Sequence, residues 1–331
     1  MTNKVSIIIP CYNAEAFIDA SICSVWEQDY PNVELIVVDD GSTDHSRERI
    51  FAWKERFSQK GAVLNYLYQN NHGPGAAINL GLKHITGDYL TLLDADDVYL
   101  PGAIGKKAKF LDEHPEYAGV RNNGWRVSGG KRKLFITSDE EKQITDLFHA
   151  LSFGKTNNWA GTYMVRTAIL FSEYPDRSIN PSRLGQNFQI LLPVAYRRKF
   201  GYIDEPLMEY RIQDDSHSQA SDPERQYHLE CSNALGWRDI YMDILGKIVA
   251  NPKEHEFYRN AYNSVFYRRA MNRAVMYGKR EDILLNYQGL QSTGLLTLED
   301  RIEYCHARKS PLQLPLRILR KLEQVFPRHE K

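Results

Sequence analysis

Three carboxyl groups lie close together at Asp94, Asp96 and Asp97, directly after the apolar run 89–93. An apolar run bounded by turn residues is typical of a buried strand. Carboxylates gathered at a strand end raise one another's pKa and repel unless a cation lies between them, and hard divalent ions prefer such oxygens. The spacing therefore predicts that Asp94 and Asp96 hold Mg²⁺ or Mn²⁺ beside a phosphorylated ligand. The alternative is an acidic loop without metal, and we expect Asp97 to cap the next helix, with Pro101 in its first turn.

The composition is that of a folded protein with a sizeable core. The chain has 331 residues, of which 42% are hydrophobic and 25% are charged, enough for one large domain or two. The formal net charge is zero and the pI is about 7.1, so no global field favours nucleic acid as a partner. No stretch has the apolar length of a membrane span or signal peptide. A cytoplasmic protein with reduced thiols is expected, because no CxxC pair occurs among Cys11, Cys23, Cys231 and Cys305.

Strand-like and helix-like segments alternate through the first hundred residues. Runs rich in β-branched residues predict strands at 5–10, 34–38 and 62–68, ahead of the strand that ends at the acidic residues. Apolar spacing predicts helices over 14–28, 45–58 and 73–82. Such alternation is typical of a parallel sheet covered by helices on both faces, with ligands bound at the carboxyl ends of the strands.

Polar residues follow each of these strands and should meet at one edge of the sheet. Each pair alone is ordinary turn chemistry, because Asn, Asp and Gly dominate turns. Four such loops at one edge favour a binding site. The pairs are Tyr12 and Asn13, Asp39 and Asp40, Asn70 and Asn71, and Asp94 and Asp96.

Five segments taken together resemble the inverting glycosyltransferases of family 2, of the type that builds bacterial polysaccharides. The likeness covers roughly residues 4–218 and implies the GT-A fold, a Rossmann-like α/β fold whose mostly parallel sheet is flanked by helices. A C-terminal helical extension follows it here. The segments are PCYNAEAFIDASICSVWEQDY, ELIVVDDGSTDHS, NHGPGAAINLGL, GDYLTLLDADDVYLP and GYIDEPLMEYR.

The resemblance implies a nucleotide-sugar site in the first half of the chain. Pro10 and Tyr12 match positions that pack on or beside the nucleotide base, and Asp40 matches the residue that hydrogen-bonds the base, usually uracil. Asp94 matches the acid near ribose and metal, and Asp96 matches the direct metal ligand. The cofactor it implies is a divalent cation, Mn²⁺ or Mg²⁺, which neutralises the departing diphosphate.

Further parts of the chain that the resemblance places near the nucleotide-sugar allow more than one interpretation. Family 2 proteins often carry Arg or Lys where this chain has Ile78, so that contact is not expected here. Asn79 is either a polar contact to the nucleotide or a buried anchor of its helix. Arg211 is either a bidentate phosphate contact or a structural ion pair. The loop 213–219 matches one that closes over the diphosphate, with His217 as a third metal ligand, flanked by the phosphate donors Ser216 and Ser218.

The position of the general base is substituted. Most relatives carry Glu-Asp after a glycine in the segment 183–195, and the Asp deprotonates the acceptor hydroxyl; here the two residues are Gln186 and Asn187. An amide takes no proton at neutral pH, and general-base help is worth about 10²–10⁴ in rate. Three alternatives stay open. Asp176 or Glu173 supplies the base, Asn187 orients the acceptor while an oxygen of the diphosphate or metal assists, or the protein binds without catalysing.

The resemblance places the acceptor beside Gln186 and Trp159, where Trp159 either stacks on a sugar face or packs in the core. We expect a glycosyltransferase domain over 1–220, with a nucleotide-binding half (1–100) and an acceptor half (101–220). A helical appendage over 221–331 would shape the acceptor site or mediate self-association. Its segment 311–326 has an apolar half and a basic half, which favours a membrane-surface helix over one docked on the core. The protein would then be peripheral on the inner face of the membrane.

Metal-dependent transfer of a sugar from a nucleotide-diphosphate sugar, with inversion, is the leading hypothesis for function. The sugar would be of the hexosyl or N-acetylhexosaminyl type, carried on UDP, and the acceptor a saccharide or lipid-linked saccharide. A sugar nucleotidyltransferase would need a glycine-rich basic loop after the first strand, and CYNAEAF is not one. A non-catalytic nucleotide-sugar-binding or assembly subunit is the second alternative, because of Asn187.

Overall fold

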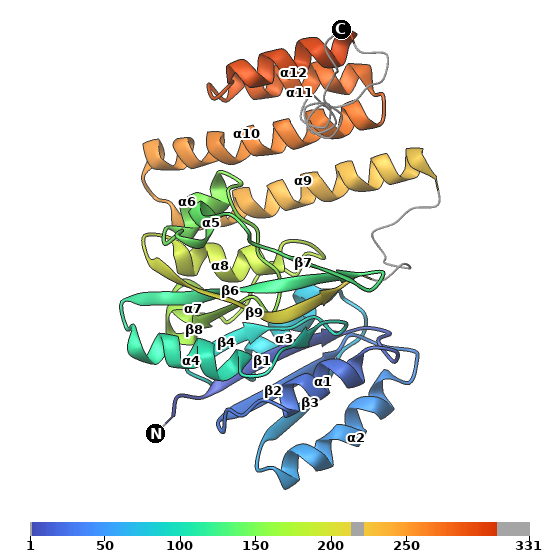
Figure 1. Cartoon of the computed structure of the whole chain (residues 1–331), viewed down its shortest axis with the longest axis vertical. Coiled ribbons are helices and arrows are strands. Elements are labelled where there is room, and N and C mark those ends of the chain that lie inside the picture. The colour runs from blue at the N-terminus through green and yellow to red at the C-terminus, as the bar shows by residue number, and fades with distance from the viewer. Residues whose placement is uncertain (1, 213–221, 310–331) are drawn as a thin grey trace, which may run out of the picture. The chain divides into compact units, whose positions relative to one another are not determined.

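The computed structural model describes residues 2–212 and 222–309. The chain divides into two compact units. The sheet unit comprises residues 1–151 and 155–214, and the helical unit comprises residues 152–154 and 215–331. Figure 1 labels most of the helices and strands of the two units.

The first half of the sheet unit is parallel, as the alternation predicts. The strand order is β3-β2-β1-β4, and Ile8 at the centre of β1 pairs with Ile36 on one side and Leu92 on the other. Nearly every residue of β1 and β2 is buried, because helices cover both faces. The elements are β1 (Val5–Cys11), α1 (Ile18–Trp26), β2 (Val33–Asp39), α2 (Ser46–Gln59), β3 (Val63–Tyr68), α3 (Pro74–Leu82) and β4 (Tyr89–Leu92).

The second half of the sheet is mixed. β8 (Tyr163–Arg166) runs antiparallel to β4, and β6 (Tyr117–Ser128) runs antiparallel to β8. β9 (Lys199–Arg211) returns parallel to β6 and pairs with the short β5 (Val98–Tyr99). The pairing of β9 with β6 is irregular around Asn122 and Asn123. β7 (Lys131–Leu134) forms a hairpin with β6.

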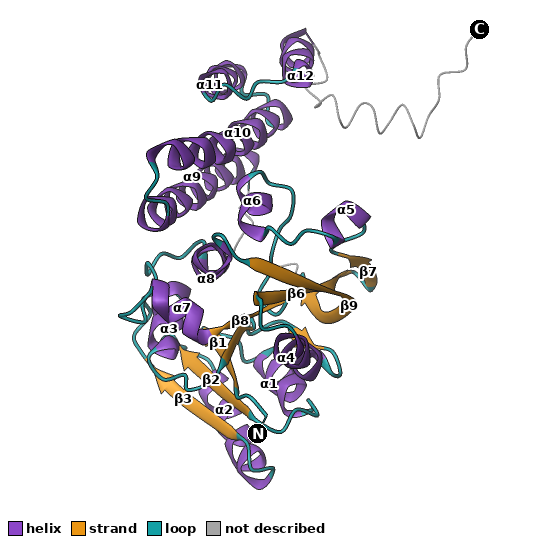
Figure 2. Ribbon diagram, turned by 90° about the vertical axis from the view of Figure 1, so that its left-hand side faces the viewer, coloured by secondary structure: helices purple, strands orange, loops and turns teal. Residues whose placement is uncertain are grey.

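The helices of the sheet unit form two layers. α1, α2 and α4 (Ala103–Glu113) share one hydrophobic core with the sheet, in which Ile22, Trp53 and Ile104 pack near Ile7 and Leu35. Figure 2 shows α1 and α4 on one side of the sheet and α3 and α7 (Thr167–Glu173) on the other. The remaining helices of this region are α5 (Asp139–Lys142), α6 (Leu147–Ser152) and α8 (Gln186–Ala195).

The helical unit contains α9 (Pro223–Ile248), α10 (Pro252–Met276), α11 (Arg280–Ser292) and α12 (Leu298–Lys309). The first two begin with proline after a capping side chain, Asp222 and Asn251. Tyr241 stacks on Tyr262, which identifies two of the C-terminal tyrosines as packing residues. All four helices lie within the segment 221–331, for which a helical appendage was predicted. No described helix is both long and apolar enough to cross a membrane, and the segment 311–326 lies outside the described residues.

Candidate functional site

The acidic residues form a tight turn at the carboxyl end of β4. Leu93 N donates to the carbonyl of Ile8 on β1, and Asp97 N donates to the carbonyl of Asp94 at 3.1 Å, which closes the turn. Ser21 of α1 anchors this turn. Its hydroxyl donates to the carbonyl oxygens of Ala95, at 2.8 Å, and Asp97, at 2.5 Å. The sheet and α1 therefore fix the backbone that presents these carboxylates.

Asp97 does not cap a helix, so that prediction was wrong. The helix α4 begins at Ala103 after Gly102, and Asp97 instead precedes β5. Its Oδ1 accepts a hydrogen bond of 3.0 Å from the backbone N of Arg211, at the end of β9. Asp97 thus ties the acidic turn to a strand more than a hundred residues away, which no local sequence pattern predicts.

The three carboxyl groups are electrostatically unfavourable on their own. Burial, and then the charge of Asp96, raise the pKa of Asp94 to about 7. Burial, and then the charges of Asp94 and Asp96, raise the pKa of Asp97 to about 9. Asp97 Oδ2 is buried and has no hydrogen-bond partner in the described part of the chain. A cluster of hard oxygen donors that lacks compensating charge suits a divalent cation such as Mn²⁺ or Mg²⁺.

Asp94 and Asp96 would supply only part of a coordination shell. Within residues 2–212 and 222–309 no group of three or more His, Cys, Asp or Glu side chains is arranged to hold a metal. Mg²⁺ commonly keeps waters and takes one or two carboxylates together with substrate phosphates, so a partial set is chemically sufficient. His217, the predicted third ligand, and the predicted phosphate donors Ser216 and Ser218 lie outside the described residues.

The loops after β1 and β2 are pinned to each other beside this turn. Asn13 has a positive φ of 48°, and its Oδ1 accepts from the backbone N of Thr43 at 2.8 Å. Ala14 N donates to Ser46 Oγ, and α1 begins at Ile18, four residues after the predicted position. Tyr12, between Cys11 of β1 and the anchored Asn13, is 43% exposed. An exposed aromatic ring on a rigid loop is a suitable platform for a planar base, as predicted for Tyr12 with Pro10.

Asp40 holds the loop that precedes α3. Its Oδ1 accepts from Gln69 Nε2 at 2.7 Å and from His72 N at 2.9 Å, and its Oδ2 accepts from Gly73 N at 2.7 Å. The side chain is almost fully buried. A carboxylate has about four lone-pair directions, so one remains for an external donor such as a base N–H. Asp40 is therefore a structural anchor in addition to the predicted base contact.

Asn79 is the anchor of its helix. Its Oδ1 accepts from Ile179 N at 2.7 Å and its Nδ2 donates to Ile179 O at 2.8 Å, so both amide groups engage the same backbone residue. Gly75, one turn earlier on α3, approaches so closely that an added Cβ would lie 2.4 Å from Ser182 O. The geometry supports the structural alternative for Asn79, which locks the loop 176–183 to the donor half. Ile78 is buried, as an apolar replacement for a basic residue should be.

The base position is occupied by an amide whose orientation is fixed. Tyr163 OH donates to Asn187 Oδ1 at 2.8 Å, from β8 to the first turn of α8. Burial, and then the charge of Asp94, raise the pKa of Tyr163 well above its usual range, so its hydroxyl stays protonated. Gln186 Nε2 donates to Ser182 O at 3.1 Å. Sequence reasoning missed Tyr163, because a tyrosine within an apolar strand carries no signal of such a contact.

The two alternative bases are engaged locally. Glu173 forms an ion pair with Arg198 at 2.8 Å, so its carboxylate already has a partner. Asp176 is exposed and accepts from Ser178 N and Oγ in a local turn. Its role as a base stays a prediction. Arg211 contributes its backbone N to Asp97, while its guanidinium lies 3.8 Å from Glu209 and is partly exposed. Its role as a phosphate contact stays a prediction.

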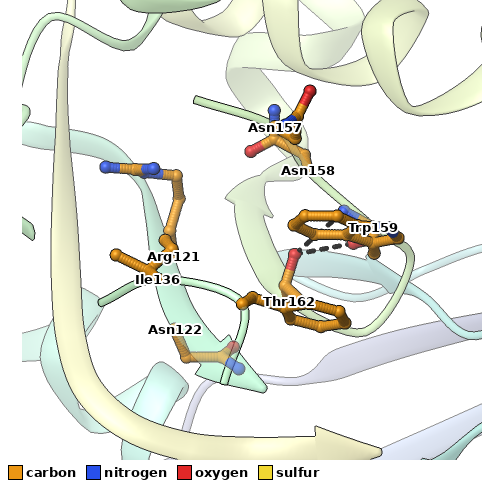
Figure 3. Close-up of a pocket in the computed structure, with 8 residues that line it drawn as sticks. Arg121, Asn122, Ile136, Asn157, Asn158, Trp159 and Thr162 are labelled. Carbon is orange, nitrogen blue, oxygen red and sulfur yellow. Dashed lines mark hydrogen bonds between the residues drawn. The ribbon is translucent and has the colours of Figure 1, made fainter. Parts of the chain in front are cut away.

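Trp159 stacks face to face on Phe135, with ring centroids 3.9 Å apart and planes inclined by 5°. Both rings border a small pocket, shown in Figure 3. Trp159 is half-buried, so part of the stacked pair packs inside and part faces outward. The pocket is lined by Arg121, Asn122, Phe135, Ile136, Asn157, Asn158, Trp159 and Thr162.

A parallel half-sheet with carboxylates at its carboxyl edge, continued by antiparallel strands, defines the GT-A class of α/β proteins. Residues 6–170 match the family described as Glycosyl transferase family 2. The chain therefore belongs to this family. An uncharacterized glycosyltransferase of Rickettsia conorii is 30% identical over 217 residues, which cover 63% of this chain and 33% of that protein. One from Haemophilus influenzae is 41% identical over 147 residues, 43% of this chain and 56% of that protein.

These matched stretches thus span about a third to a half of the relatives' own lengths. Solved structures show the same fold. TarS residues 1–349 of S. aureus has a TM-score of 0.62 at 21% identity, covering 92% of this chain and 87% of that one. The mannosyltransferase PcManGT of Pyrobaculum calidifontis has a TM-score of 0.54 at 16% identity, covering 99% of this chain and 88% of that one. That protein was solved with GDP-Man and Mn²⁺, and TarS also with UDP and with UDP-GlcNAc.

Proposed function

We propose that this protein transfers a hexosyl or N-acetylhexosaminyl unit from a UDP-linked donor to a saccharide or lipid-linked saccharide, with inversion at the anomeric carbon. The observation that carries the proposal is the acidic turn, rigidly presented at the same sheet edge as Tyr12 and Asp40. An exposed aromatic ring suits the planar base of a nucleoside diphosphate, and a cation held by carboxylates suits its two phosphates. Both features lie at one edge of the sheet. The fold shared with TarS, which was solved with UDP and UDP-GlcNAc, supports a uridine donor.

The chain's own residues divide the work in this proposal. Asp94 and Asp96 would hold Mn²⁺ or Mg²⁺, which when bound neutralises the charge of the diphosphate as it leaves. Tyr12 and Pro10 would pack on the base, and Asp40 would accept a hydrogen bond from its imide N–H. Asn187, held at Oδ1 by Tyr163, would present its Nδ2 to the acceptor oxygen and orient the hydroxyl, whose proton would pass to an oxygen of the departing diphosphate. Catalysis would then be slow, because general-base help of about 10²–10⁴ is missing.

A donor-hydrolysis and transfer assay tests the proposal. The purified protein is incubated with a panel of UDP- and GDP-sugars, candidate saccharide acceptors and Mn²⁺, and released nucleotide is measured with and without EDTA. Asp96→Asn serves as the matched inactive variant. We expect turnover with a UDP-sugar that requires metal and Asp96, and no release from any donor would overturn the catalytic proposal.

Asn187 also favours a second candidate, a non-catalytic subunit that binds nucleotide-sugar. The two candidates make different predictions for the same protein. Calorimetric binding of UDP with Mn²⁺ in the absence of any turnover would support the binding subunit. Turnover in the wild type would exclude it.

The membrane contact through 311–326 belongs to the same proposal, because a lipid-linked acceptor lies at a membrane surface. Co-sedimentation with anionic liposomes compares the full chain with one truncated before Pro311. Equal pelleting of both proteins would remove the membrane contact from the proposal. Self-association through the helical unit is tested separately by light scattering.

A further inference from the structure

The hairpin of β6 and β7 lies beside the acidic turn in the sheet unit. β6 runs between β7 and β9, so that Arg126 of β6 pairs with Lys133 on one side and with Tyr210 on the other. The next residue of β9, Arg211, donates its backbone N to Asp97 Oδ1 at 3.0 Å. The end of the hairpin is therefore one strand away from the acidic turn.

One face of this hairpin carries arginines that have a carboxylate partner. Alternate side chains of a strand point to the same face, which places Arg132 of β7 with Glu209 and Arg211 of β9. Glu209 is buried and forms an ion pair with Arg132 and another with Arg211, the latter at 3.8 Å. The charges on this face therefore offset one another within the protein.

The opposite face, which we call the basic face, carries cations that have no such partner. It is defined by Arg126 of β6 with Lys131 and Lys133 of β7, and all three side chains are exposed. None of them forms an ion pair with any residue in the described part of the chain. Arg126 lies directly opposite Lys133, and like charges at such a cross-strand pair destabilise a sheet. A bound anion would offset this repulsion.

Edge protection explains only part of the basic face. Lysines on an edge strand keep it from pairing with another chain. Among the described strands β7 pairs only with β6, so Lys131 and Lys133 fit that role. Arg126 does not fit it, because β6 is paired on both sides. Neither edge protection nor an ion pair accounts for the arginine at this position.

Aromatic rings lie on the same face as these cations. Phe135 approaches Gly124 so closely that an added Cβ there would lie 2.6 Å from its ring, and it stacks on Trp159. The Tyr210 ring is 6.3 Å from Phe135, between centroids. Burial, and then the charges of the acidic turn, raise the pKa of Tyr210, whereas the charge of Arg126 lowers it. Tyr210 is thus within electrostatic reach of both the acidic turn and the basic face.

We propose that the basic face binds negatively charged groups of the acceptor, and that the acceptor is a saccharide carrying phosphate or carboxylate groups. Arg126, Lys131 and Lys133 would bind those groups, and the exposed part of the stacked Phe135 and Trp159 would contact an adjoining sugar ring. The rings and the neighbouring acidic turn favour a saccharide over a lipid surface as the partner. The identity of the ligand as an acceptor rests on the proposed function.

Ligand-observed NMR on the full chain measures this binding without requiring turnover. The probes are fructose 1,6-bisphosphate and trigalacturonate, with fructose and maltotriose as their uncharged matches. We expect at least one anion to bind about tenfold or more tightly than its uncharged match, and its affinity to fall at high salt because exposed charges are screened. The preference between the two anions distinguishes phosphate from carboxylate groups.

The decisive variant combines Arg126→Gln with Lys133→Gln. It should weaken anion binding by about tenfold. Its Tm should not fall, because the substitutions remove a like-charge pair from the sheet. The matched control combines Lys83→Gln, at the end of α3, with Lys109→Gln, on the exposed face of α4, and should bind the anion like the wild type.

Equal binding of the anions and their uncharged matches, or an unchanged affinity in the double variant of the basic face, would overturn the proposal. An equal loss in the lysine control would also overturn it, because net charge alone would then explain the binding. Displacement of the anion by UDP with Mn²⁺ would assign the basic face to the donor. Loss of co-sedimentation with anionic liposomes in the double variant, without binding of either saccharide anion, would assign it to lipid. UDP binding is measured on the same sample, so its absence would count against the proposed function while leaving the anion result intact.

Discussion

The hydroxyl of Tyr163 donates a hydrogen bond of 2.8 Å to Oδ1 of Asn187. Tyr163 belongs to β8, which pairs with β4, the strand that ends at the acidic turn. The bond therefore connects the substituted base position of α8 to the strand that pairs with β4 and its acidic turn. Because Oδ1 of Asn187 accepts this hydrogen bond, the amide is oriented with its Nδ2 directed away from Tyr163. Asn187 can then act only as a hydrogen-bond donor toward a ligand.

Asn187→Asp should increase the rate of transfer by about tenfold or more. The introduced carboxylate would keep the hydrogen bond from Tyr163, which favours its ionised form, and it would offer the acceptor hydroxyl a general base. The measurement is kcat against pH for the wild type and the variant. An acidic limb in the pH profile should appear only in Asn187→Asp.

Asn187→Ala and Tyr163→Phe are the controls for this prediction. Tyr163→Phe leaves Asn187 Oδ1 without its donor, so kcat should fall several-fold while KM for the donor sugar stays unchanged. The prediction fails if Asn187→Asp is no faster than Asn187→Ala, because position 187 would then not face the acceptor hydroxyl.

Variants at Asp40 and Tyr12 should differ in their effects: the first should lower both stability and UDP affinity, and the second should lower UDP affinity alone. Asp40→Asn places an NH₂ group where Gln69 Nε2, His72 N and Gly73 N now donate to carboxylate oxygens, so at least one donor loses its acceptor. We expect the free energy of unfolding to drop by about 1–3 kcal/mol and UDP affinity to fall with it. Tyr12→Ala, at an exposed side chain, should reduce UDP affinity with a change in Tm of a degree or two.

Denaturant unfolding and calorimetry with UDP check this pair. A large loss of stability in Tyr12→Ala would mean that its ring packs in the loop instead of serving a ligand. Unchanged stability in Asp40→Asn would show that the three hydrogen bonds to Asp40 contribute little.

The parallel half of the fold could be predicted because its signals are local. Strands β1 and β2 contain the uninterrupted apolar runs 7–9 and 35–38, and turn residues follow each strand. The carboxyl ends of parallel strands meet by topology, so Tyr12, Asp40 and Asp94 could be placed at one edge before any coordinates were known.

The contacts between the two halves of the sheet unit could not be predicted in the same way, because they connect distant segments. Asp97 looks like a helix cap, yet its partner is the backbone N of Arg211. Asn79 resembles a ligand contact, yet it clamps Ile179, a hundred residues later. In each case the partner is set by tertiary packing, which periodicity does not record.

Mn²⁺ should stabilise the wild type through Asp94 and Asp96. A cation that binds only the folded state raises Tm with its concentration. The raised pKa values of Asp94 and Asp97 reflect burial first and the charges of neighbouring aspartates second, and a bound cation would offset both. We expect Mn²⁺ with UDP to raise Tm by several degrees in the wild type and to have little effect on Asp96→Asn. Asp139→Asn, at an exposed aspartate on α5, is the matched control and should respond like the wild type. If Mn²⁺ with UDP raised the Tm of Asp96→Asn as much as that of the wild type, Asp96 would not be a ligand of the cation.

Lys107 supports the loop that carries Trp159. Its side chain is fully buried, and Nζ donates to Gly161 O at 3.0 Å and lies 4.4 Å from the centroid of the Tyr99 ring. Burial lowers the pKa of Lys107 to about 7. The folded protein therefore holds this amine only weakly protonated at pH 7 and above, whereas the unfolded chain keeps it protonated up to the ordinary lysine range.

The stability of the wild type relative to Lys107→Met should therefore rise with pH. Between pH 7 and about 10 the unfolded wild type binds a proton at Lys107 that the folded wild type does not. The free energy of unfolding of the wild type therefore rises by about 1 kcal/mol per pH unit. Lys107→Met has no such proton, so its free energy of unfolding lacks this rise. Below pH 7 both states bind the proton and the difference is constant. At pH 9.5 the variant should be the less stable protein, because Gly161 O has lost its donor. Urea unfolding at pH 7.0, 8.0 and 9.5 measures the difference, with Lys109→Met on the exposed face of α4 as the control that shows no such slope. A difference that does not vary with pH would mean that Lys107 is charged in the folded protein throughout this range.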